Sequence, residues 1–155
     1  MAKAKLSSAR RRLILPALRL GGASLVLGAA VFSSAGAATP ALARPRFMRR
    51  AFELRQISLE RGDHGYGAVV VKDGVVVGEG ANAVNTTPDP TAHSEVQAIR
   101  DAARRLGAAR LSGCELFTNA RPCPMCEMAA YWAGIERIYI GESIVDAGAP
   151  RYGGC

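Results

Sequence analysis

Two short stretches of this chain carry side chains that can bind a metal ion or transfer protons. Cys123 and Cys126 stand three residues apart in the stretch CPMC, and His93 and Glu95 stand two apart in the stretch HSE. Residues i and i+3 share one face of a helix, so both thiolates can reach a single ion. With the imidazole as a third ligand, the fourth tetrahedral position stays open to water, which is the coordination of a catalytic zinc.

Each of these features taken alone has a more ordinary explanation. A lone C-x-x-C pair is compatible with a redox disulfide, with half of a zinc site, or with buried packing. A histidine or glutamate in a first helical turn is most often a polar residue that suits the helix dipole. The combination of H-x-E with P-C-x-x-C about thirty residues later is far more specific. It favours a zinc site in which Glu95 moves protons without binding the metal.

The surrounding pattern predicts that both stretches lie at the beginnings of helices. Apolar residues at helical spacing predict one helix over residues 93–106, with Gly107 as its stop, and a second helix over 123–133. The N-termini of both helices would point partial positive charge at the site. That charge favours thiolate ligands.

The rest of the chain alternates helices with strands. A helix is predicted over 46–61, two β-branched runs at 68–71 and 75–77 flank an Asp-Gly turn, and short strands are predicted at 114–119 and 136–142. The resulting order is α-β-β-α-β-α-β. This order predicts a three-layer α/β/α domain around a mixed central β-sheet.

Charge and composition restrict the class of protein. The chain has 155 residues, of which 49% are hydrophobic and 21% charged, and this is typical of one globular domain with a core. Residues 1–43 hold six of the basic residues and no acidic one, whereas the chain from Ala51 onwards has ten basic and thirteen acidic residues. The body is therefore slightly acidic, which disfavours nucleic acid as a partner.

Residues 1–43 have the pattern of an export signal. A basic stretch precedes an apolar run, and residues 41–43 form an A-x-A-like cleavage site. Arg10–Arg12, followed by two apolar residues, resembles the twin-arginine signal. We expect a cleaved leader over 1–43, a zinc-dependent catalytic domain over 44–155, and a periplasmic or extracellular protein that meets the twin-arginine translocase during export. The alternative is an uncleaved membrane anchor over 20–32, although this run is short for a bilayer.

The segment over residues 67–146 resembles the cytidine deaminase-like superfamily, in its nucleoside and guanine deaminase branch. The stretches DPTAHSEVQAIRDAARRLGA and CELFTNARPCPMCEMAAYWAGIERIYIG carry the resemblance. Paired H-x-E and P-C-x-x-C motifs are the signature of zinc deaminases. The resemblance implies that His93, Cys123 and Cys126 hold one Zn²⁺ per chain and that Glu95 shuttles protons.

The resemblance also implies a substrate class and an assembly. Asn82 matches the asparagine that hydrogen-bonds the base, the backbone of Ala92 matches a contact near the metal, and Trp132 matches an aromatic residue near the base pocket. The implied reaction is zinc-dependent hydrolytic deamination of a nucleobase or nucleoside, with release of ammonia. Guanine is the expected substrate, and a homodimer is the expected assembly.

The chain departs from the family pattern at several positions. Arg121 stands where the family usually has Glu, and Tyr66 stands where Phe is frequent. Guanine deaminases of this branch continue through Phe-Asp-Asp, whose second Asp assists with the base, whereas residues 152–154 here are Tyr-Gly-Gly.

Three alternative functions follow from these observations. One is a tRNA adenosine deaminase-like enzyme, which the acidic body disfavours. Another is a zinc-binding deaminase-like protein without catalysis, suggested by Arg121 and by the missing acid. The third is a thiol–disulfide protein that uses Cys123 and Cys126, and this reading leaves His93 and Glu95 unexplained.

Overall fold

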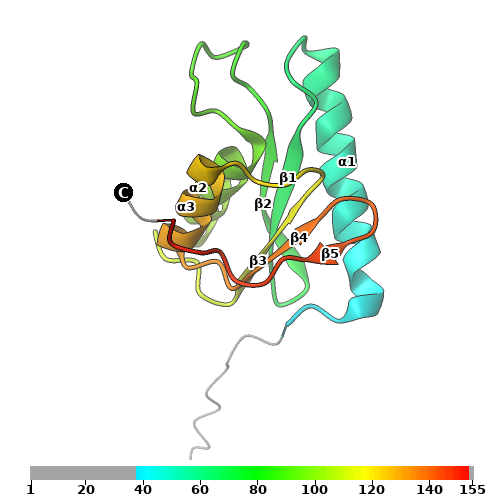
Figure 1. Ribbon diagram of the computed structural model, residues 1–155, viewed down its shortest axis with the longest axis vertical. Helices are drawn as coiled ribbons and strands as arrows, with labels where there is room; N and C mark the ends of the chain where they lie inside the picture. The colour runs from blue at the N-terminus through cyan, green and yellow to red at the C-terminus, as the bar shows by residue number, and fades with distance from the viewer. Residues whose placement is uncertain (1–37, 154–155) are drawn as a thin grey trace, which may run out of the picture. The chain divides into compact units, whose positions relative to one another are not determined.

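A mixed five-stranded sheet forms the centre of the part of the chain that the structure describes, residues 38–153 of a computed structural model (Figure 1). The strands are β1 (Gly67–Lys72), β2 (Val75–Ala81), β3 (Cys114–Thr118), β4 (Arg137–Ile140) and β5 (Val145–Asp146). Their order in the sheet is β2-β1-β3-β4-β5. The β3–β4 pair is parallel and the other pairs are antiparallel, so the sheet is mixed, as predicted.

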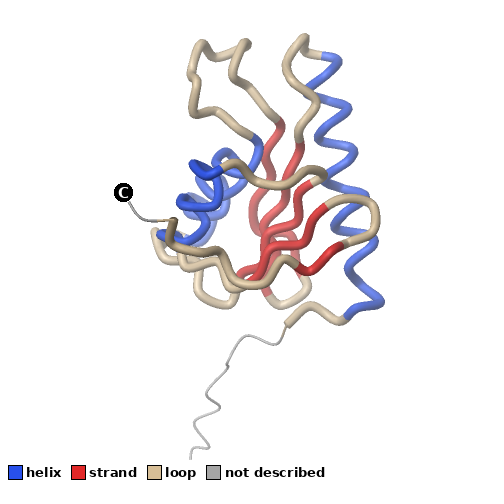
Figure 2. Tube along the Cα trace, in the orientation of Figure 1, coloured by secondary structure: helices blue, strands red, loops and turns tan. Residues whose placement is uncertain are grey.

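Three helices cover the two faces of this sheet, and Figure 2 shows them in blue on either side of the red strands. They are α1 (Arg44–Glu60), α2 (Ser94–Leu106) and α3 (Pro124–Ala133), and a short 3-10 turn (Ala41–Ala43) precedes α1. Helix α2 ends where predicted, because Gly107 adopts the left-handed conformation that closes a helix, with φ of 62°. The short strand β5 was not predicted.

Strand β1 supplies the core on both sides of the sheet. Val69 and Val71 pack in the cluster that includes α1, whereas Ala68 and Val70 pack in the cluster that includes α2 and α3. Side chains alternate between the two faces of a strand, so a strand buried on both faces reads as a continuous apolar run. The architecture is therefore the predicted three-layer α/β/α arrangement.

The hairpin between β1 and β2 positions Asn82, one of the predicted substrate-binding residues. Asp73 and Gly74 form the hairpin turn predicted from Asp-Gly, and their φ angles of 49° and 73° are those of a type I′ turn. Strand β2 then continues beyond the predicted 75–77 run to Ala81. This extension places Asn82 at the end of the strand.

Most of the predicted leader, residues 1–37, lies outside the described residues, but the segment just before α1 packs on the domain. The backbone N–H of buried Thr39 donates to Glu115 Oε2 at 3.1 Å, and Tyr139 Oη donates to Glu115 Oε1 at 3.2 Å. The Nε of Arg44 donates to the carbonyl oxygen of Thr39 at 3.2 Å. Cleavage after Ala43, as predicted, would therefore remove a donor from a buried carboxylate.

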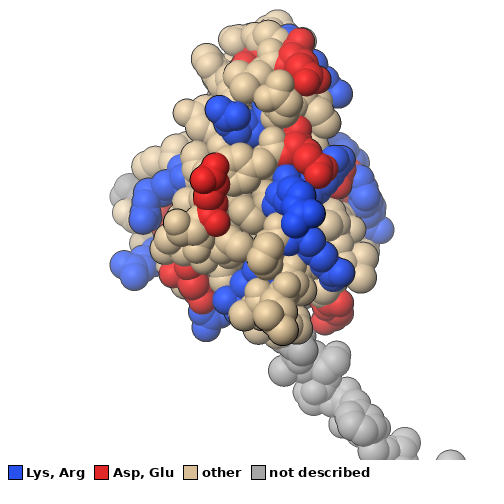
Figure 3. All heavy atoms as spheres, turned by 90° about the vertical axis from the view of Figure 1, so that its right-hand side faces the viewer, with Lys and Arg blue, Asp and Glu red and all other residues tan. Residues whose placement is uncertain are grey.

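Within residues 38–153, no helix combines the length and apolarity needed to cross a bilayer. Charged side chains of both signs lie on the α1 side of the domain, which faces the viewer in Figure 3. Arg50 of α1 pairs with Glu53 at 2.8 Å and with Glu79 of β2 at 2.8 Å. The described part of this face thus presents mixed charge rather than one basic field.

Glycine at position 80 allows α2 to lie directly on β2. A Cβ atom there would overlap the carbonyl oxygen of Ser94 and crowd the backbone nitrogen of Ala98, both in α2. Backbone atoms in the first turn of a helix have little room to move. A side chain at this position must therefore push the beginning of α2, and with it His93, away from the sheet.

We expect Gly80→Ala to lower the free energy of unfolding by about 3 kcal/mol, the upper part of the range for overpacked cores. Denaturant unfolding of the two proteins measures this difference. Gly153→Ala is the control, because a Cβ there would meet its nearest atom, Met128 Cε, at 3.9 Å. If Gly80→Ala proved as stable as wild type, the close contact between α2 and β2 would be contradicted.

Candidate metal centre

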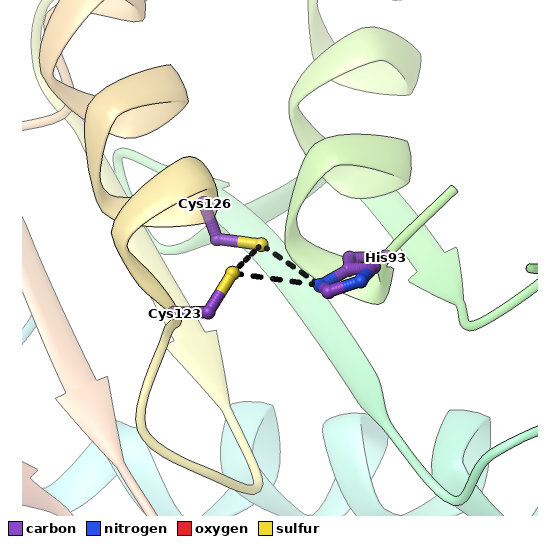
Figure 4. A group of neighbouring side chains, drawn as sticks. All are labelled: His93, Cys123 and Cys126. Atoms are coloured by element: carbon purple, nitrogen blue, oxygen red, sulfur yellow. Dashed lines mark hydrogen bonds between the residues drawn. The ribbon is translucent and has the colours of Figure 1, made fainter. Parts of the chain in front are cut away.

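The beginnings of α2 and α3 bring the three predicted metal ligands together. His93 is the N-cap residue of α2, Cys123 is the N-cap residue of α3, and Cys126 lies in the first turn of α3. Figure 4 shows the imidazole and the two thiols pointing toward one another from the two helices. Among the described residues, no side chain caps either helix N-terminus. The positive ends of both helix dipoles therefore act on the site and favour anionic ligands.

The distances between the three ligand atoms fit one tetrahedral zinc ion. His93 Nδ1 lies 3.6 Å from Cys123 Sγ and 3.5 Å from Cys126 Sγ, and the two sulfur atoms are 3.6 Å apart. With Zn–S of about 2.3 Å and Zn–N of about 2.0 Å, tetrahedral angles place two sulfurs about 3.8 Å apart and sulfur about 3.5 Å from nitrogen. The three residues are therefore positioned to bind a metal ion.

The protonation state of the buried Cys126 thiol is also consistent with a site that binds a cation. Burial, followed by the negative charge of Glu95, raises the pKa of the Cys126 thiol far above its usual range. In metal-free protein this sulfur therefore keeps its proton, and a dication would be needed to hold the thiolate form. One imidazole nitrogen with two thiolates is a donor set that suits zinc.

Glu95 lies beside the three ligands and is buried. Its Oε2 atom accepts a hydrogen bond from Ser94 Oγ at 3.0 Å and lies 3.5 Å from Cys126 Sγ, and its Oε1 atom accepts one from Thr118 Oγ1 at 3.3 Å. These two hydroxyl groups orient the carboxylate, which has no positively charged partner within residues 38–153. A carboxylate held next to a metal site, and outside its ligand set, is suited to carrying protons.

A cavity of about 190 Å³ opens over this cluster. It is lined by Tyr66, His93, Glu95, Ala120, Arg121 and Cys123. Two of the three metal ligands and Glu95 thus face the same space. A small ring-shaped molecule in this cavity would meet the metal and the carboxylate together.

Two of the predicted substrate-binding residues lie near this cavity but do not line it. Asn82 is buried and its backbone N–H donates to the carbonyl oxygen of Tyr66 at 3.0 Å. Ala92 is buried, its N–H donates to Asp89 O at 3.0 Å, and its carbonyl oxygen accepts from Ala83 N at 2.9 Å. Their contacts with a base stay predictions.

Trp132 is not brought to the cavity. It follows Cys123 by nine residues and lies in the last turn of α3, about 13 Å further along the helix axis. Its side chain is 66% exposed and packs against Tyr131 and Tyr152, with ring centroids 5.4 and 6.0 Å away. The predicted contact of Trp132 with the base therefore finds no support in this geometry.

Asp63, which the sequence did not predict, holds the side chain of Asn82. Its buried carboxylate accepts a hydrogen bond from Asn82 Nδ2 at 2.6 Å. It also accepts hydrogen bonds from the backbone N–H groups of His64, Asn85 and Thr86 and from the Thr86 hydroxyl. Burial alone would raise the pKa of Asp63, but these hydrogen bonds outweigh it and hold the pKa below its usual range. The ionised carboxylate thereby fixes the amide of Asn82.

We expect Asp63→Asn to destabilise the fold at neutral pH, because an amide cannot accept this set of hydrogen bonds. The pKa of Asp63 is lower in the folded than in the unfolded chain, so its stabilisation is present above about pH 4 and is lost as the pH falls further. The difference in unfolding free energy between wild type and variant should therefore shrink below pH 4. Denaturant unfolding at pH 7, 5 and 3 measures it, and a difference that grew on acidification would contradict this assignment.

The sequence matches a protein-family model named for the cytidine and deoxycytidylate deaminase zinc-binding region over residues 43–142. The guanine deaminase of Bacillus subtilis is 46% identical over 102 residues, which are 65% of each protein. A tRNA-specific adenosine deaminase of Agrobacterium fabrum is 37% identical over 110 residues, or 71% of this chain and 72% of that protein. The chain thus spans about two thirds of the length of these relatives.

Solved structures give the same relationship. The crystal structure of the Bacillus subtilis guanine deaminase superposes with a TM-score of 0.60 at 45% identity, over 62% of each chain. A guanine deaminase from Nitrosomonas europaea superposes with a TM-score of 0.58 at 27% identity, over 61% of this chain and 56% of the other. The range matched by the family model contains all three metal ligands and Glu95.

Proposed function

The chain belongs to the cytidine and deoxycytidylate deaminase family, and from this premise we propose that it is a zinc-dependent hydrolytic deaminase of a nucleobase or nucleoside. The observation that carries this proposal is the arrangement of His93, Cys123 and Cys126 at zinc-like distances, with the carboxylate of Glu95 in the same cavity. Similarity to two guanine deaminases supports guanine as the first substrate to test.

The residues around the cavity have separate roles in this reaction. Zinc, when held by His93, Cys123 and Cys126, would supply the nucleophile by lowering the pKa of a water molecule to about 7. The Glu95 carboxylate takes the proton of the attacking water and delivers protons to a ring nitrogen and to the departing amine. Ser94 and Thr118 hold that carboxylate in place through their hydroxyl groups. The products are an oxo base and ammonia.

Asn82 is the residue proposed to read the base. The Asp63 carboxylate accepts a hydrogen bond from one N–H of the Asn82 amide. The amide oxygen and the second N–H of Asn82 are thus left for a ligand. Because the same carboxylate also binds the backbone of Asn85 and Thr86, the amide and the loop after β2 are held as one unit. We propose that this unit aligns the base over the metal.

The tRNA adenosine deaminases are also similar in sequence, and they give the principal alternative substrate. From Ala51 onwards, this chain has ten basic and thirteen acidic residues. A surface for a folded RNA needs a concentration of basic side chains. A small base or nucleoside therefore fits this chain better.

Ammonia release by the zinc-loaded protein tests the proposal. The substrates are guanine, adenine, cytosine, their nucleosides and a tRNA anticodon stem-loop, and the expected result is turnover of a guanine compound. If zinc is present and every compound is inert, the chain is a zinc-binding deaminase-like protein without catalysis. If no zinc binds and the Cys123–Cys126 pair cycles between thiol and disulfide, the redox alternative holds.

We also propose export and a homodimeric assembly. Export rests on the leader pattern of residues 1–43, and the homodimer rests on the family resemblance. Cell fractionation and light scattering address them separately, and neither result alters the assignment of the metal site.

A further inference from the structure

Residues 39–43, which we call the docked segment, pack on the sheet immediately before α1. Thr39 has only 2% of its surface exposed, and its backbone N–H donates to Glu115 Oε2 at 3.1 Å. The backbone N–H of Ala43 donates to Pro40 O at 2.9 Å, and Ala43 packs against the apolar cluster that includes α1. The docked segment is therefore part of the folded domain, although it belongs to the predicted leader.

The carboxylate of Glu115 depends on the docked segment for one of its hydrogen bonds. Glu115 is buried, and its other donor is Tyr139 Oη at 3.2 Å. Within residues 38–153 no lysine or arginine forms an ion pair with this carboxylate. Loss of a donor from a buried carboxylate leaves part of its desolvation uncompensated. Removal of the segment would therefore destabilise the folded domain.

Arg44 holds the docked segment from its other end. Its Nε atom donates to the carbonyl oxygen of Thr39 at 3.2 Å, and its guanidinium carbon lies 4.5 Å from the centroid of the Tyr139 ring. A guanidinium group over an aromatic ring is attracted by the ring electrons. Arg44 thus joins the segment to the same tyrosine that donates to Glu115. A cut after Ala43 would discard the segment and make Arg44 the new chain terminus.

A second A-x-A-like motif stands directly before the docked segment. Residues 35–37 are Ala-Gly-Ala, and they follow the same apolar run as the Ala-Leu-Ala of residues 41–43. The small residues of either motif suit a signal cleavage site, so the motif alone does not choose between them. The fold does distinguish them. A cut after residue 37 keeps every contact of the docked segment, whereas a cut after residue 43 removes them all.

Resting on the export proposed above, we infer that the leader is cut between Ala37 and Ala38 and that the mature domain keeps the docked segment. The cut hydrolyses one peptide bond: one water is consumed, a carboxyl group forms on Ala37 and an amino group forms on Ala38. Ala38 is exposed and Thr39 is buried, so the packed part of the chain begins one residue after this bond. The partner is a peptidase that recognises small residues at two positions before the cut.

The mass of the intact protein exported by cells that express the full chain tests the position of the cut. The expected mass is that of a chain beginning at Ala38. Ala41→Pro destroys the motif over 41–43 and leaves the motif over 35–37 unchanged, so its processing should match wild type. The fold should tolerate this variant, because Ala41 begins a 3-10 turn and Pro40 has a ψ of 139°. An exported wild-type chain that begins at Arg44 would overturn the inference.

Digestion of the folded full-length chain with elastase separates this inference from export. Elastase cuts after small residues, and brief digestion should leave fragments that still contain the docked segment. Thr39→Pro removes the N–H that donates to Glu115. This variant should be cut after Ala43 roughly 10- to 100-fold faster than wild type, the range expected for a lost hydrogen bond to a charged group. Ala41→Pro is the matched control, because it keeps that donor and should be cut after Ala43 at the wild-type rate.

The outcomes of the two experiments distinguish the position of the cut from export itself. If the cells export no processed protein, the export proposal fails, and digestion still decides whether the docked segment is part of the fold. Rapid cutting after Ala43 in the folded wild type would overturn the inference. Equal cutting rates for wild type and Thr39→Pro would also overturn it, because the hydrogen bond to Glu115 would then not hold the segment. Neither experiment depends on deamination.

Discussion

Replacing Cys126 with alanine is expected to abolish zinc binding and to lower the free energy of unfolding by about 4 kcal/mol when zinc is present at about a thousand times its Kd. The sulfur of Cys126 is buried and lies 3.5 Å from His93 Nδ1 and 3.6 Å from Cys123 Sγ. Without it, two ligands remain, and they cannot hold the ion that links α2 to α3. At about 2–4 °C per kcal/mol for a domain of this size, Tm should fall by about 10 °C.

Cys114→Ala is the matched control, because Cys114 is equally buried but lies in β3, outside the ligand cluster. This substitution also removes one buried sulfur atom from the core, but the protein should keep one zinc per chain. A chelator should lower the Tm of wild type and of the Cys114 variant, and it should leave the Cys126 variant unchanged. If the Cys126 variant still bound zinc with wild-type affinity, the assignment of this ligand would be wrong.

Glu95→Gln is expected to lower kcat by about 10³- to 10⁴-fold while the protein keeps its zinc, because the amide cannot transfer the protons that the carboxylate transfers. Glutamine has nearly the same shape: its amide oxygen can accept a hydrogen bond from one of the hydroxyl groups of Ser94 and Thr118, and its NH2 group can donate to the other, because a hydroxyl group also accepts. The fold and the metal site should therefore be preserved. Initial rates of ammonia release, with the zinc content of the same sample, measure the effect.

Glu115→Gln provides the comparison for this variant. Glu115 is also a buried carboxylate, but it hydrogen-bonds Thr39 and Tyr139 and does not line the cavity. Its replacement should lower the free energy of unfolding. It should leave kcat within about twofold of wild type, because neither the lining of the cavity nor the proton carrier Glu95 is changed. An undiminished kcat in Glu95→Gln would show that another group carries the protons.

Local signals in the sequence predicted most of the elements. The Asp-Gly pair predicted the hairpin turn, and Gly107 predicted the end of α2, because both positions require a positive φ. The full length of β2 was not predicted, since Gly78 and Gly80 weaken any strand pattern. Tertiary packing explains both glycines, because side chains at these positions would collide with α2.

The metal ligands could be predicted because helical spacing places Cys123 and Cys126 on one face, and because H-x-E precedes them in a known signature. Asp63 could not be predicted in this way. Its bond to Asn82 spans 19 residues and depends on how the loop before β1 meets the end of β2. The contact of Trp132 with a base was implied by the family resemblance alone and stays a prediction.

The central claim, that this zinc site performs deamination, is tested most directly by adding zinc to metal-free protein while ammonia release is followed. The substrates are guanine and guanosine at saturating concentration. The account predicts that the rate rises in proportion to added zinc, reaches its maximum at one zinc per chain, and stays near zero in Cys126→Ala. A rate that did not depend on zinc, or a fully loaded protein that released no ammonia from either compound, would contradict it.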